Sequence, residues 1–548
     1  MTRTELINRL TRERFQVLII GGGIVGAGIA RDAAMRGLKV ALIEQGDFAS
    51  GTSSKTSKLI HGGLRYLEQG RVRLVRESLR ERQILRTIAP ALVCPVSVLL
   101  PTYEGHRDEP WKIKLGLSLY DLLAWGDPFT SHRMLSRRRV SSLEPGLCVE
   151  GLRSVGLYTD CQMDDARLCL ANILQAVEFG AVCCNYVRLR TLLSANRKIC
   201  GAAVEDVWTA KTHEVHSQVV VNAAGPWADR IRQMSQVDAE PRLAPTKGIH
   251  LVLPRLVHQG IFSQTQDQRR IFLLPWGNYT LVGTTESAVD GSLDRLAANA
   301  KEVDYLLTEV NRILPGSRVG IQEVVASFAG ARPLLAFSGS ARQASREHRL
   351  DQDPQGLISV LGGKYTTYRL MARQAVDWIL KMHRWTSERC LTDQVNLMES
   401  ADAINLDHWK DLTHRTDPEL LTKLLTRYGT RAIAILQLID REPALAKPVC
   451  PHHDYLEAEW VHAIAREMAC TISDVFIRRT RIAWSSCQGL DALSTIALLL
   501  TRYVRNIPQS IDAQVKAYKT ELARGLSFRS SAGQSPVFSA STAADSDD

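Results

Sequence analysis

Residues 17–44 read VLIIGGGIVGAGIARDAAMRGLKVALIE, and this stretch decides the fold of the chain. The apolar run 17–20 predicts a short parallel strand that is buried on both faces. Gly21, Gly23 and Gly26 then supply G-x-G-x-x-G where the strand should turn into a helix. The first glycine permits the tight turn, the second lets a pyrophosphate approach the backbone, and the third allows close helix–strand packing.

A second strand and an acidic residue follow at the spacing of a nucleotide-binding unit. Residues 40–43 predict the next parallel strand, which ends on Glu44, whose carboxylate can accept hydrogen bonds from ribose hydroxyls. A glycine-rich turn with only a structural role is the alternative, because the glycine motif alone is a weak signal. Strand, glycines, helix, strand and terminal acid occur here in register, and together they predict a dinucleotide site.

The size and charge of the chain narrow the class of protein. At 548 residues it is too long for one core and predicts about two to four domains. Its 45% hydrophobic and 23% charged residues are typical of a soluble globular protein. The formal charge of +10 indicates an anionic partner, either a phosphorylated substrate, an acidic lipid or nucleic acid. The sequence has no recognisable nucleic-acid motif, so we expect no nucleic-acid partner.

The eleven cysteines are scattered and include no C-x-x-C pair, which predicts reduced thiols in a cytosolic compartment. Cys450, His452 and His453 are close enough in sequence to suggest a metal site. A fourth ligand at suitable spacing is missing, so we predict that this proximity is coincidental and that the chain holds no metal.

The apolar stretches of the sequence were compared with signal peptides and membrane-spanning segments. The basic N-terminus followed by 17–30 resembles a signal peptide, but cleavage after that run would destroy the nucleotide-binding unit. Elsewhere in the sequence no apolar run reaches the ~18–20 residues needed to span a bilayer.

Residues 111–125 (WKIKLGLSLYDLLAW) are apolar at helical spacing, with Trp111, Leu115, Leu119 and Leu122 on one face. An interfacial helix on an anionic membrane would show this pattern together with the nearby lysines and arginines. A helix that covers the core would show it as well, and the sequence alone favours this second interpretation.

Small and hydroxyl residues follow several of the predicted strands. Residues 51–57 predict a loop whose hydroxyls and amides could bind phosphate or a polar ring. Residues 219–221 predict a buried strand, followed by the small residues of NAAGPW. A second strand–glycine–helix junction comes at 356–381, where Thr366 and Thr367 are plausible cap residues and a positive helix end should lie near the cofactor.

The predicted type of secondary structure changes twice beyond the nucleotide-binding unit. Residues 242–332 are rich in β-type segments and predict a separate, largely antiparallel sheet as a platform for the substrate. Beyond about residue 390 the pattern is mostly helical to about 525, and the tail has the composition of disorder. We therefore predict dinucleotide-binding and substrate domains over 15–390, a helical domain over 391–525 and a disordered tail over 526–548.

A series of motifs runs along the chain in the order GGGIVGAG, TSSKTSKLIHGGLRYLEQG, VNAAGPW, KGIHLVLP, VGTTE, AGARPL and LGGKYTTYR. This order resembles the FAD-dependent glycerol-3-phosphate dehydrogenases of the respiratory type. The glycine motif alone belongs to many flavoproteins, but KLIHGGLRYL and GGKYTTYR together are much more specific. The resemblance covers about residues 15–375 and continues more weakly in the C-terminal helical domain.

The resemblance implies an α/β fold with three parts: a discontinuous Rossmann-like FAD domain, a β-rich substrate domain of the D-amino-acid-oxidase type, and a C-terminal helical domain. The FAD domain would comprise about 15–98, 155–240 and 340–390, and the substrate domain mainly 241–340. The implied reaction is oxidation of sn-glycerol 3-phosphate to dihydroxyacetone phosphate, with electrons passing through FAD to a membrane quinone.

The same resemblance implies a cytoplasmic protein held peripherally on the inner face of the cell membrane, against an anionic lipid surface. The sequence has no convincing transit peptide, so we expect a bacterial rather than a mitochondrial setting. A homodimer is compatible with the resemblance.

Residue by residue, the resemblance assigns five side chains to the chemistry. Arg65, Tyr66 and Arg332 correspond to contacts with the substrate phosphate and polar head, which require a cation. His250 corresponds to the base that takes the hydroxyl proton, and Lys364 to a group that stabilises the substrate oxygen or the reduced flavin. The residues expected at the cofactor are Gly21, Gly23, Gly26, Glu44, Thr52, Ser53, Ser57, Lys58, Leu59, His61, Ala224, Gly225, Gly363, Lys364 and Thr366.

Each chemical assignment has a structural alternative. Arg65 could be a surface arginine, Arg332 a brace at the domain junction, and His250 a sheet histidine with its hydrogen bonds satisfied. Lys364 could serve only to start a helix, and His61 could lie beside the flavin without reacting.

Some features depart from the family pattern, and they leave other functions open. Glu286 stands where aspartate is usual, and residues 101–110 and both terminal extensions have no counterpart. One competing function is an oxidase of the same substrate that releases hydrogen peroxide. Others are a flavoenzyme for 2-hydroxy acids or amino acids, and a flavin-carrying assembly or sensor protein without turnover.

Overall fold

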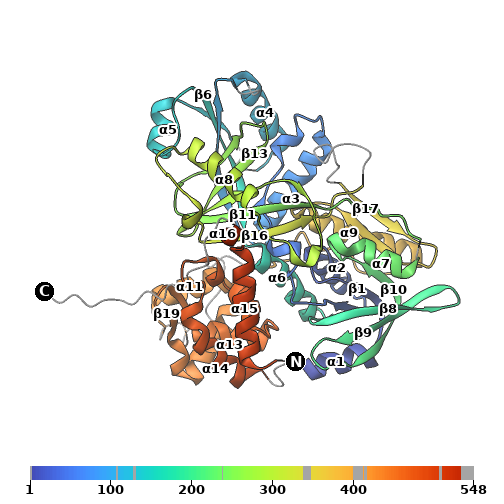
Figure 1. Ribbon diagram of the computed structural model, residues 1–548. Coiled ribbons are helices and arrows are strands. Elements are labelled where there is room, and N and C mark those ends of the chain that lie inside the picture. The colour runs from blue at the N-terminus through green and yellow to red at the C-terminus, as the bar shows by residue number, and fades with distance from the viewer. Residues whose placement is uncertain are drawn as a thin grey trace.

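Two large β-sheets with their covering helices and a group of C-terminal helices make up most of the described part of the chain (Figure 1). The structure is a computed structural model that describes residues 3–105, 109–127, 131–236, 238–336, 347–398, 412, 416–504 and 509–531.

The first sheet carries the predicted nucleotide-binding unit. Its parallel strands are ordered β18–β10–β1–β2–β7, and β17 adds to the β18 edge in antiparallel orientation. Both β1 and β2 are buried on the two faces of the sheet over most of their length, as expected of strands between two layers. The bounds are β1 (Arg14–Ile20), β2 (Val40–Ile43), β7 (Val182–Cys184), β10 (Thr212–Asn222), β17 (His348–Gln352) and β18 (Ile358–Gly362).

Three helices cover one face of this sheet. Helix α2 (Ile24–Met35) packs against both α6 (Asp165–Glu178) and α9 (Tyr368–His383), and the three share a core with the sheet. The hairpin β8–β9 (Val187–Ala195 and Lys198–Asp206) extends the same sheet, because β9 pairs antiparallel with β10. The apolar side of α1 (Arg3–Arg12) shares the core on the other face of the sheet. The order of strand, glycines, helix and strand that the sequence predicts over 17–44 is confirmed.

The second sheet is mostly antiparallel, as predicted, although β12 and β4 pair in parallel. Its order is β15–β11–β14–β13–β12–β4–β6–β3, with β16 paired to β11 and β5 to β6. The bounds are β3 (Leu59–Ile60), β4 (Val93–Tyr103), β5 (Arg133–Leu135), β6 (Leu152–Met163), β11 (Thr246–Pro254), β12 (Gly260–Gln264), β13 (Arg270–Trp276), β14 (Tyr279–Gly283), β15 (Ser287–Ala288) and β16 (Ala326–Arg332).

Strands β3 to β6 therefore belong to the second sheet, although the sequence locates that sheet mainly within 241–340. Pairing between segments so far apart leaves no local pattern, which explains the difference. Helix α8 (Ala300–Ile313) covers one side of this sheet, while α3 (Val72–Ile88) and α4 (Pro110–Leu123) cover the other. A short helix, α5 (Arg137–Leu143), lies next to β6.

The C-terminal helices enclose a core of their own that is centred on the buried Trp460. They pack beside the two sheets in Figure 1, where they are drawn in orange and red. The elements are α11 (Pro418–Tyr428), α12 (Ala432–Arg441), the hairpin β19–β20 (Pro448–Cys450 and His453–Leu456), α13 (Glu457–Arg466), α14 (Leu493–Tyr503) and α15 (Ile511–Gly525).

Buried ion pairs join a π-helical turn of the C-terminal part, Asp474–Arg479, to the segment that follows β2. Asp47 follows β2 closely and accepts hydrogen bonds from Arg478 at 2.5 Å and from Arg479 at 2.6 and 2.9 Å. Burial acts to raise the pKa of Asp47, but the two guanidinium groups outweigh it and lower that pKa to about 2. The carboxylate therefore stays ionised at neutral pH and compensates the buried arginines.

Helix α4 does not cover the core with the face that the sequence indicates. The buried residues of the helix are Ile113, Leu117 and Tyr120. Four exposed side chains at this helix, here called the α4 patch, are Trp111, Leu115, Leu122 and Trp125. The segment is apolar on more than one side, so periodicity alone could not decide which side packs inward. No described helix is both long enough and apolar enough to cross a bilayer.

The predicted cap residues and the start of the predicted tail also differ from expectation. Thr367 precedes α9 without a side-chain cap bond, and the hydroxyl of Thr366 instead accepts a bond of 3.2 Å from the His61 backbone N–H. Leu526 and Phe528 are buried in the core beneath α8, so the chain is still packed at the start of 526–548. A short helix, α16 (Phe528–Ser531), follows, and residues 532–548 lie outside the described residues.

Candidate active site

A cavity of about 940 Å³ lies where the two sheets meet. The carboxyl ends of β1, β2, β10 and β18 border it on one side, and β11 and β16 border it on the other. In open α/β sheets this end of the strands is where ligands bind. The volume is near the top of the range for small-molecule pockets, which is roughly 300–1,000 Å³, so a large cofactor can be accommodated.

The glycines of the nucleotide-binding unit are required by their surroundings. Gly21 has a φ of +114°, and a Cβ there would lie 2.7 Å from the carbonyl oxygen of Ala223. A Cβ on Gly26 would lie 1.9 Å from the carbonyl oxygen of Gly21. Larger residues would therefore push the helix off the strand. Gly26 supports the site from behind, whereas Gly21 and Gly23 line the cavity.

Glu44 and Ser53 hold the backbone around these glycines. The Glu44 carboxylate accepts hydrogen bonds of 2.8 Å from the N–H groups of Gly22 and Gly46. Burial raises the pKa of Glu44, and these two backbone bonds act against that rise. The Ser53 hydroxyl accepts a bond of 2.9 Å from the Ile24 N–H at the start of α2. Both residues line the cavity, and their contact with the cofactor stays a prediction.

The second sheet presents one side of β11 and β16 to the cavity. Gly248 and His250 alternate along β11, and they pair with Gly330 and Phe328 of β16. The two glycines carry no side chain, so the cavity reaches the sheet surface between larger neighbours. Arg332 lies at the end of β16 on this same side.

Arg332 is held at the cavity wall by neighbouring oxygens. Its Nη2 donates to the Thr284 hydroxyl at 2.8 Å and to the Thr285 carbonyl at 3.0 Å. A Cβ on Gly248 would lie 2.2 Å from this nitrogen, so the glycine leaves room for the guanidinium. Sequence reasoning did not single out Gly248, although its place in KGIHLV beside His250 was a usable signal.

His250 is a buried imidazole within hydrogen-bonding distance of Ser57. Its Nε2 lies 2.8 Å from the Ser57 hydroxyl, and its ring stacks on Phe328 with 5.0 Å between ring centroids. Its Nδ1 is buried and has no hydrogen-bond partner among the described residues. Burial lowers the pKa of His250 well below its ordinary value, and Arg332 and Lys58 lower it further. The ring is therefore neutral at neutral pH and can accept a proton.

Lys364 and Tyr66 meet at another part of the cavity wall. The Lys364 ammonium lies 4.1 Å from the centroid of the Tyr66 ring and donates to the Ser78 hydroxyl at 3.2 Å. Both residues line the cavity. Arg65 does not, and its guanidinium carbon lies 5.6 Å from the centroid of the same tyrosine ring.

Most of the other residues predicted at the cofactor also line the cavity. They are Thr52, Ser57, Leu59, His61, Ala224, Gly225, Gly363 and Thr366. Lys58 is the exception besides Gly26, because it points into the protein and pairs with Asp165 at 2.5 Å. Its ammonium also donates to the Ser54 carbonyl at 2.6 Å, so Lys58 braces the loop instead of lining the site.

Some lining residues lie outside the set predicted from the sequence. Trp227 donates its indole N–H to Asp294 at 2.7 Å, and Arg230 pairs with the same carboxylate at 3.1 Å. All three line the cavity, as do Arg188 and Arg190 of β8. Trp227 closes the VNAAGPW motif and could have been found there. The arginines lie in stretches without a local signal.

The cavity fits an extended cofactor that carries phosphates, as FAD does. The glycine turn would hold the pyrophosphate near the start of α2, and Glu44 would hold the ribose. Gly21 lies so close to Ala223 that any side chain there would clash, so only a bare backbone fits at this turn. Arginines around the cavity add positive charge for an anionic cofactor.

Comparison with known proteins agrees with this geometry. Residues 16–378 match the family described as FAD dependent oxidoreductase, and 364–506 match the C-terminal domain of alpha-glycerophosphate oxidase. The glycerol-3-phosphate dehydrogenase of Synechocystis sp. is 36% identical over 528 residues, which cover 92% of this chain and 95% of the relative. The aerobic glycerol-3-phosphate dehydrogenase of Bacillus subtilis is 34% identical over 500 residues, with coverages of 88% and 89%.

A solved structure extends the likeness to the fold. The glycerol-3-phosphate dehydrogenase from Bacillus halodurans, complexed with FAD, matches with a TM-score of 0.77 at 27% identity. The match covers 96% of this chain and 97% of that one. The predicted α/β fold with a C-terminal helical domain and the predicted FAD cofactor are thereby confirmed. The chain belongs to the FAD-dependent glycerol-3-phosphate dehydrogenase family.

Proposed function

We propose that this protein oxidises sn-glycerol 3-phosphate to dihydroxyacetone phosphate and passes the electrons through FAD to a membrane quinone. One observation carries the proposal: a neutral imidazole, His250, and a guanidinium, Arg332, lie on one cavity-facing side of β11 and β16. The substrate offers a hydroxyl proton to the first group and a phosphate to the second. The names of the relatives support this choice of substrate.

His250 is the proposed acceptor of the hydroxyl proton. FAD, when bound, accepts the hydride that leaves carbon 2 of the substrate. The Ser57 hydroxyl lines the cavity and lies 2.8 Å from Nε2, so it is placed to orient the ring or to relay the proton. Glycine at position 283 leaves room for the imidazole ring, because a Cβ there would lie 2.3 Å from the ring carbon Cδ2. A positioned base of this kind contributes roughly 10²- to 10⁴-fold to a rate.

Arg332 is the proposed phosphate ligand. A guanidinium binds phosphate with charge-assisted bonds, and Thr284 and Thr285 keep it at the cavity wall. Lys364 and Tyr66 complete the polar wall, and an ammonium there would stabilise negative charge on the substrate oxygen or the reduced cofactor. Arg65 lies outside the cavity lining, which makes it a weaker candidate for direct contact.

The electron acceptor separates the leading function from its alternative. An oxidase of the same substrate would pass electrons to oxygen, and the match to the C-terminal domain of alpha-glycerophosphate oxidase gives that alternative a specific basis. We expect rapid turnover with a soluble quinone and little hydrogen peroxide in air. Peroxide formed in proportion to the substrate consumed, with no gain from added quinone, would favour the oxidase.

A peripheral membrane position would bring the protein to its quinone. The proposal is supported by the α4 patch, in which Trp125 is 84% exposed, and by the exposed Lys112 and Lys114 on the same helix. Exposed aromatic and aliphatic side chains next to lysines are typical of helices that lie on anionic lipid. Figure 1 shows α4 at the end of the molecule that is far from the C-terminal helices.

A further inference from the structure

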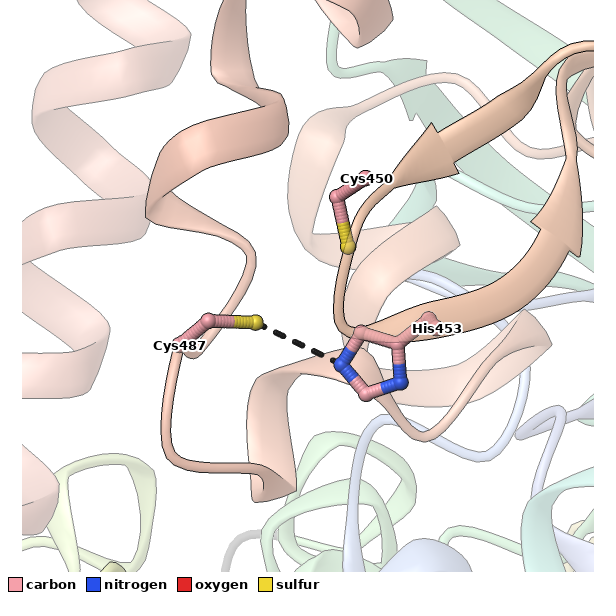
Figure 2. A group of neighbouring side chains, drawn as sticks. All are labelled: Cys450, His453 and Cys487. Carbon is pink, nitrogen blue, oxygen red and sulfur yellow. Dashed lines mark hydrogen bonds between the residues drawn. The ribbon is translucent and has the colours of Figure 1, made fainter. Parts of the chain in front are cut away.

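Two cysteines and a histidine of the C-terminal domain converge on one point. Cys450 ends β19 and His453 begins β20, so a C-x-x-H pair straddles the tip of this hairpin. Cys487 lies on the loop that follows a 3₁₀ turn at Ile482–Trp484. Figure 2 shows the loop facing the hairpin, with both sulfur atoms directed toward the imidazole. The three possible ligand atoms all lie within 4.8 Å of one another.

The separation of these atoms suits a tetrahedral metal. The Cys487 sulfur lies 3.4 Å from Nε2 of His453. Zinc bonds of about 2.3 Å to sulfur and about 2.0 Å to nitrogen place two ligands of a tetrahedron about 3.6 Å apart. The same geometry requires about 3.8 Å between two sulfurs, which the 4.8 Å limit accommodates. Small side-chain rotations would thus bring all three ligands to bonding distance.

Hydrogen-bonding groups lie next to the Cys487 sulfur and the His453 imidazole. Burial raises the pKa of the Cys450 thiol to about 11, although the backbone N–H groups of His452 and His453 act to lower it, so zinc would have to displace this proton. The Cys487 sulfur accepts a hydrogen bond from the N–H of Gly489 at 3.4 Å. Backbone amides directed at sulfur stabilise a thiolate, which is the form that binds metal. Ser485 lies 2.9 Å from Nε2 of His453 and would yield this nitrogen to a metal.

We propose that Cys450, His453 and Cys487 form a zinc site, with water in the fourth position. Sequence reasoning predicted no metal here because a fourth ligand beside Cys450, His452 and His453 was missing. The fold instead brings Cys487, 34 positions beyond His453, to Cys450 and His453. Two thiolates would balance the charge of Zn²⁺. Soft thiolate ligands together with imidazole select zinc over magnesium or calcium.

The site would join the hairpin to a loop that lies next to the catalytic sheet. The loop that carries Cys487 contacts the second sheet through Gln488, which donates to the Val325 carbonyl at 3.0 Å, and through the Ser486 N–H, which donates to the Tyr279 hydroxyl at 2.9 Å. Trp484 packs edge-on to Phe328, the residue on which His250 stacks. Zinc would thus fix the hairpin to the loop that supports this aromatic contact.

Zinc content of the purified protein tests the proposal. Full-length holoenzyme without an affinity tag is treated with a chelator, incubated with zinc, passed through gel filtration and analysed by mass spectrometry for zinc. We expect about one zinc per chain in the wild type and in Cys200→Ser, a control cysteine of β9. In Cys450→Ser and Cys487→Ser we expect at least about tenfold weaker zinc binding. Zinc should also raise the Tm of the wild type and leave that of Cys487→Ser unchanged.

Cobalt substitution provides a readout that needs no variant. Bound Co²⁺ should give the intense red-region bands of tetrahedral coordination with thiolate ligands, which lie clear of the flavin absorption. Absence of zinc and cobalt binding in the wild type would overturn the proposal, and so would equal binding by Cys487→Ser. A Cys450–Cys487 disulfide in protein alkylated directly in the lysate would also overturn it. None of these readouts depends on flavin reduction, so the two proposals fail separately.

Discussion

The Ser57 hydroxyl lies 2.8 Å from Nε2 of His250 and so joins two segments that are 193 positions apart. We expect Ser57→Ala to leave Nε2 without this partner and to slow anaerobic flavin reduction by about tenfold, the effect of about 1.4 kcal/mol. FAD content should not change. Stopped-flow absorbance measures the rate, and Ser57→Thr, which keeps a hydroxyl, is the control. Loss of FAD from Ser57→Ala would show instead that Ser57 mainly holds the cofactor.

The low pKa of His250 sets the pH dependence of the same step. The residue is expected to act as a base, which requires the neutral ring, and burial with Arg332 and Lys58 keeps the pKa well below 6.5. We expect the rate of flavin reduction to stay level as the pH falls from about 8 to about 6.5, and to fall only under more acidic conditions. His250→Ala should be slower by roughly 10²-fold or more at every pH. A wild-type midpoint near an unperturbed histidine value would contradict the assignment.

Arg332 should determine whether the substrate must be phosphorylated. Removing a guanidinium that binds phosphate costs about 1.5–3 kcal/mol, so Arg332→Ala should raise KM for sn-glycerol 3-phosphate by roughly 10- to 100-fold. The activity toward glycerol, which has no phosphate, should change little. Steady-state kinetics with both substrates measures the difference, with the exposed Arg466→Ala as control. Equal losses for the two substrates would make Arg332 a brace and not a phosphate ligand.

The position of the glycine turn at the cavity could be predicted from the sequence, whereas the surroundings of His250 and Lys58 could not. Gly21, Gly26 and Glu44 lie in one continuous βαβ unit, so the relative positions of these residues follow from their spacing in the sequence. The partner of His250 could not be read in this way, because the loop that carries Ser57 meets β11 only in the folded protein, 193 positions away in the sequence. Lys58 carries the same charge whether it lines a cavity or pairs with a buried Asp165, and only the fold distinguishes the two cases.

The exposed side of α4 gives a direct test of membrane attachment. Leu115→Glu combined with Trp125→Glu replaces apolar residues that would enter the lipid with charges. We expect at least about tenfold weaker sedimentation with anionic vesicles, and weaker wild-type sedimentation as salt rises. Leu498→Glu is a matched control, because Leu498 is 67% exposed on α14, away from α4. Equal loss in both proteins, or no vesicle binding by the wild type, would contradict the role of the α4 patch.

His462 of α13 should make the helical domain sensitive to acid. Burial lowers the pKa of His462 to about 4, although Glu467 acts to raise it. An unfolded histidine titrates near pH ~6.5, so between these values the unfolded chain binds more protons and the free energy of unfolding falls as the pH falls. His462→Phe, which keeps a ring beside Tyr428, should remove about 3 kcal/mol of this dependence.

Urea unfolding at about pH 7 and about pH 4 measures that difference. The control is His216→Phe, because His216 lies on β10 with a side chain that is partly exposed. If the free energy of unfolding of His462→Phe falls between these two pH values as much as that of the wild type, other groups account for the acid sensitivity.

Anaerobic titration of the purified yellow protein with sn-glycerol 3-phosphate tests the central claim most directly. The flavin absorbance reports cofactor, substrate and redox role in one measurement. We expect full bleaching with about one equivalent of substrate per flavin, formation of dihydroxyacetone phosphate, and recovery of the colour on addition of a quinone. Bound FAD that keeps its absorbance with excess sn-glycerol 3-phosphate, or that is bleached equally well by a 2-hydroxy acid or an amino acid, would contradict the proposed function.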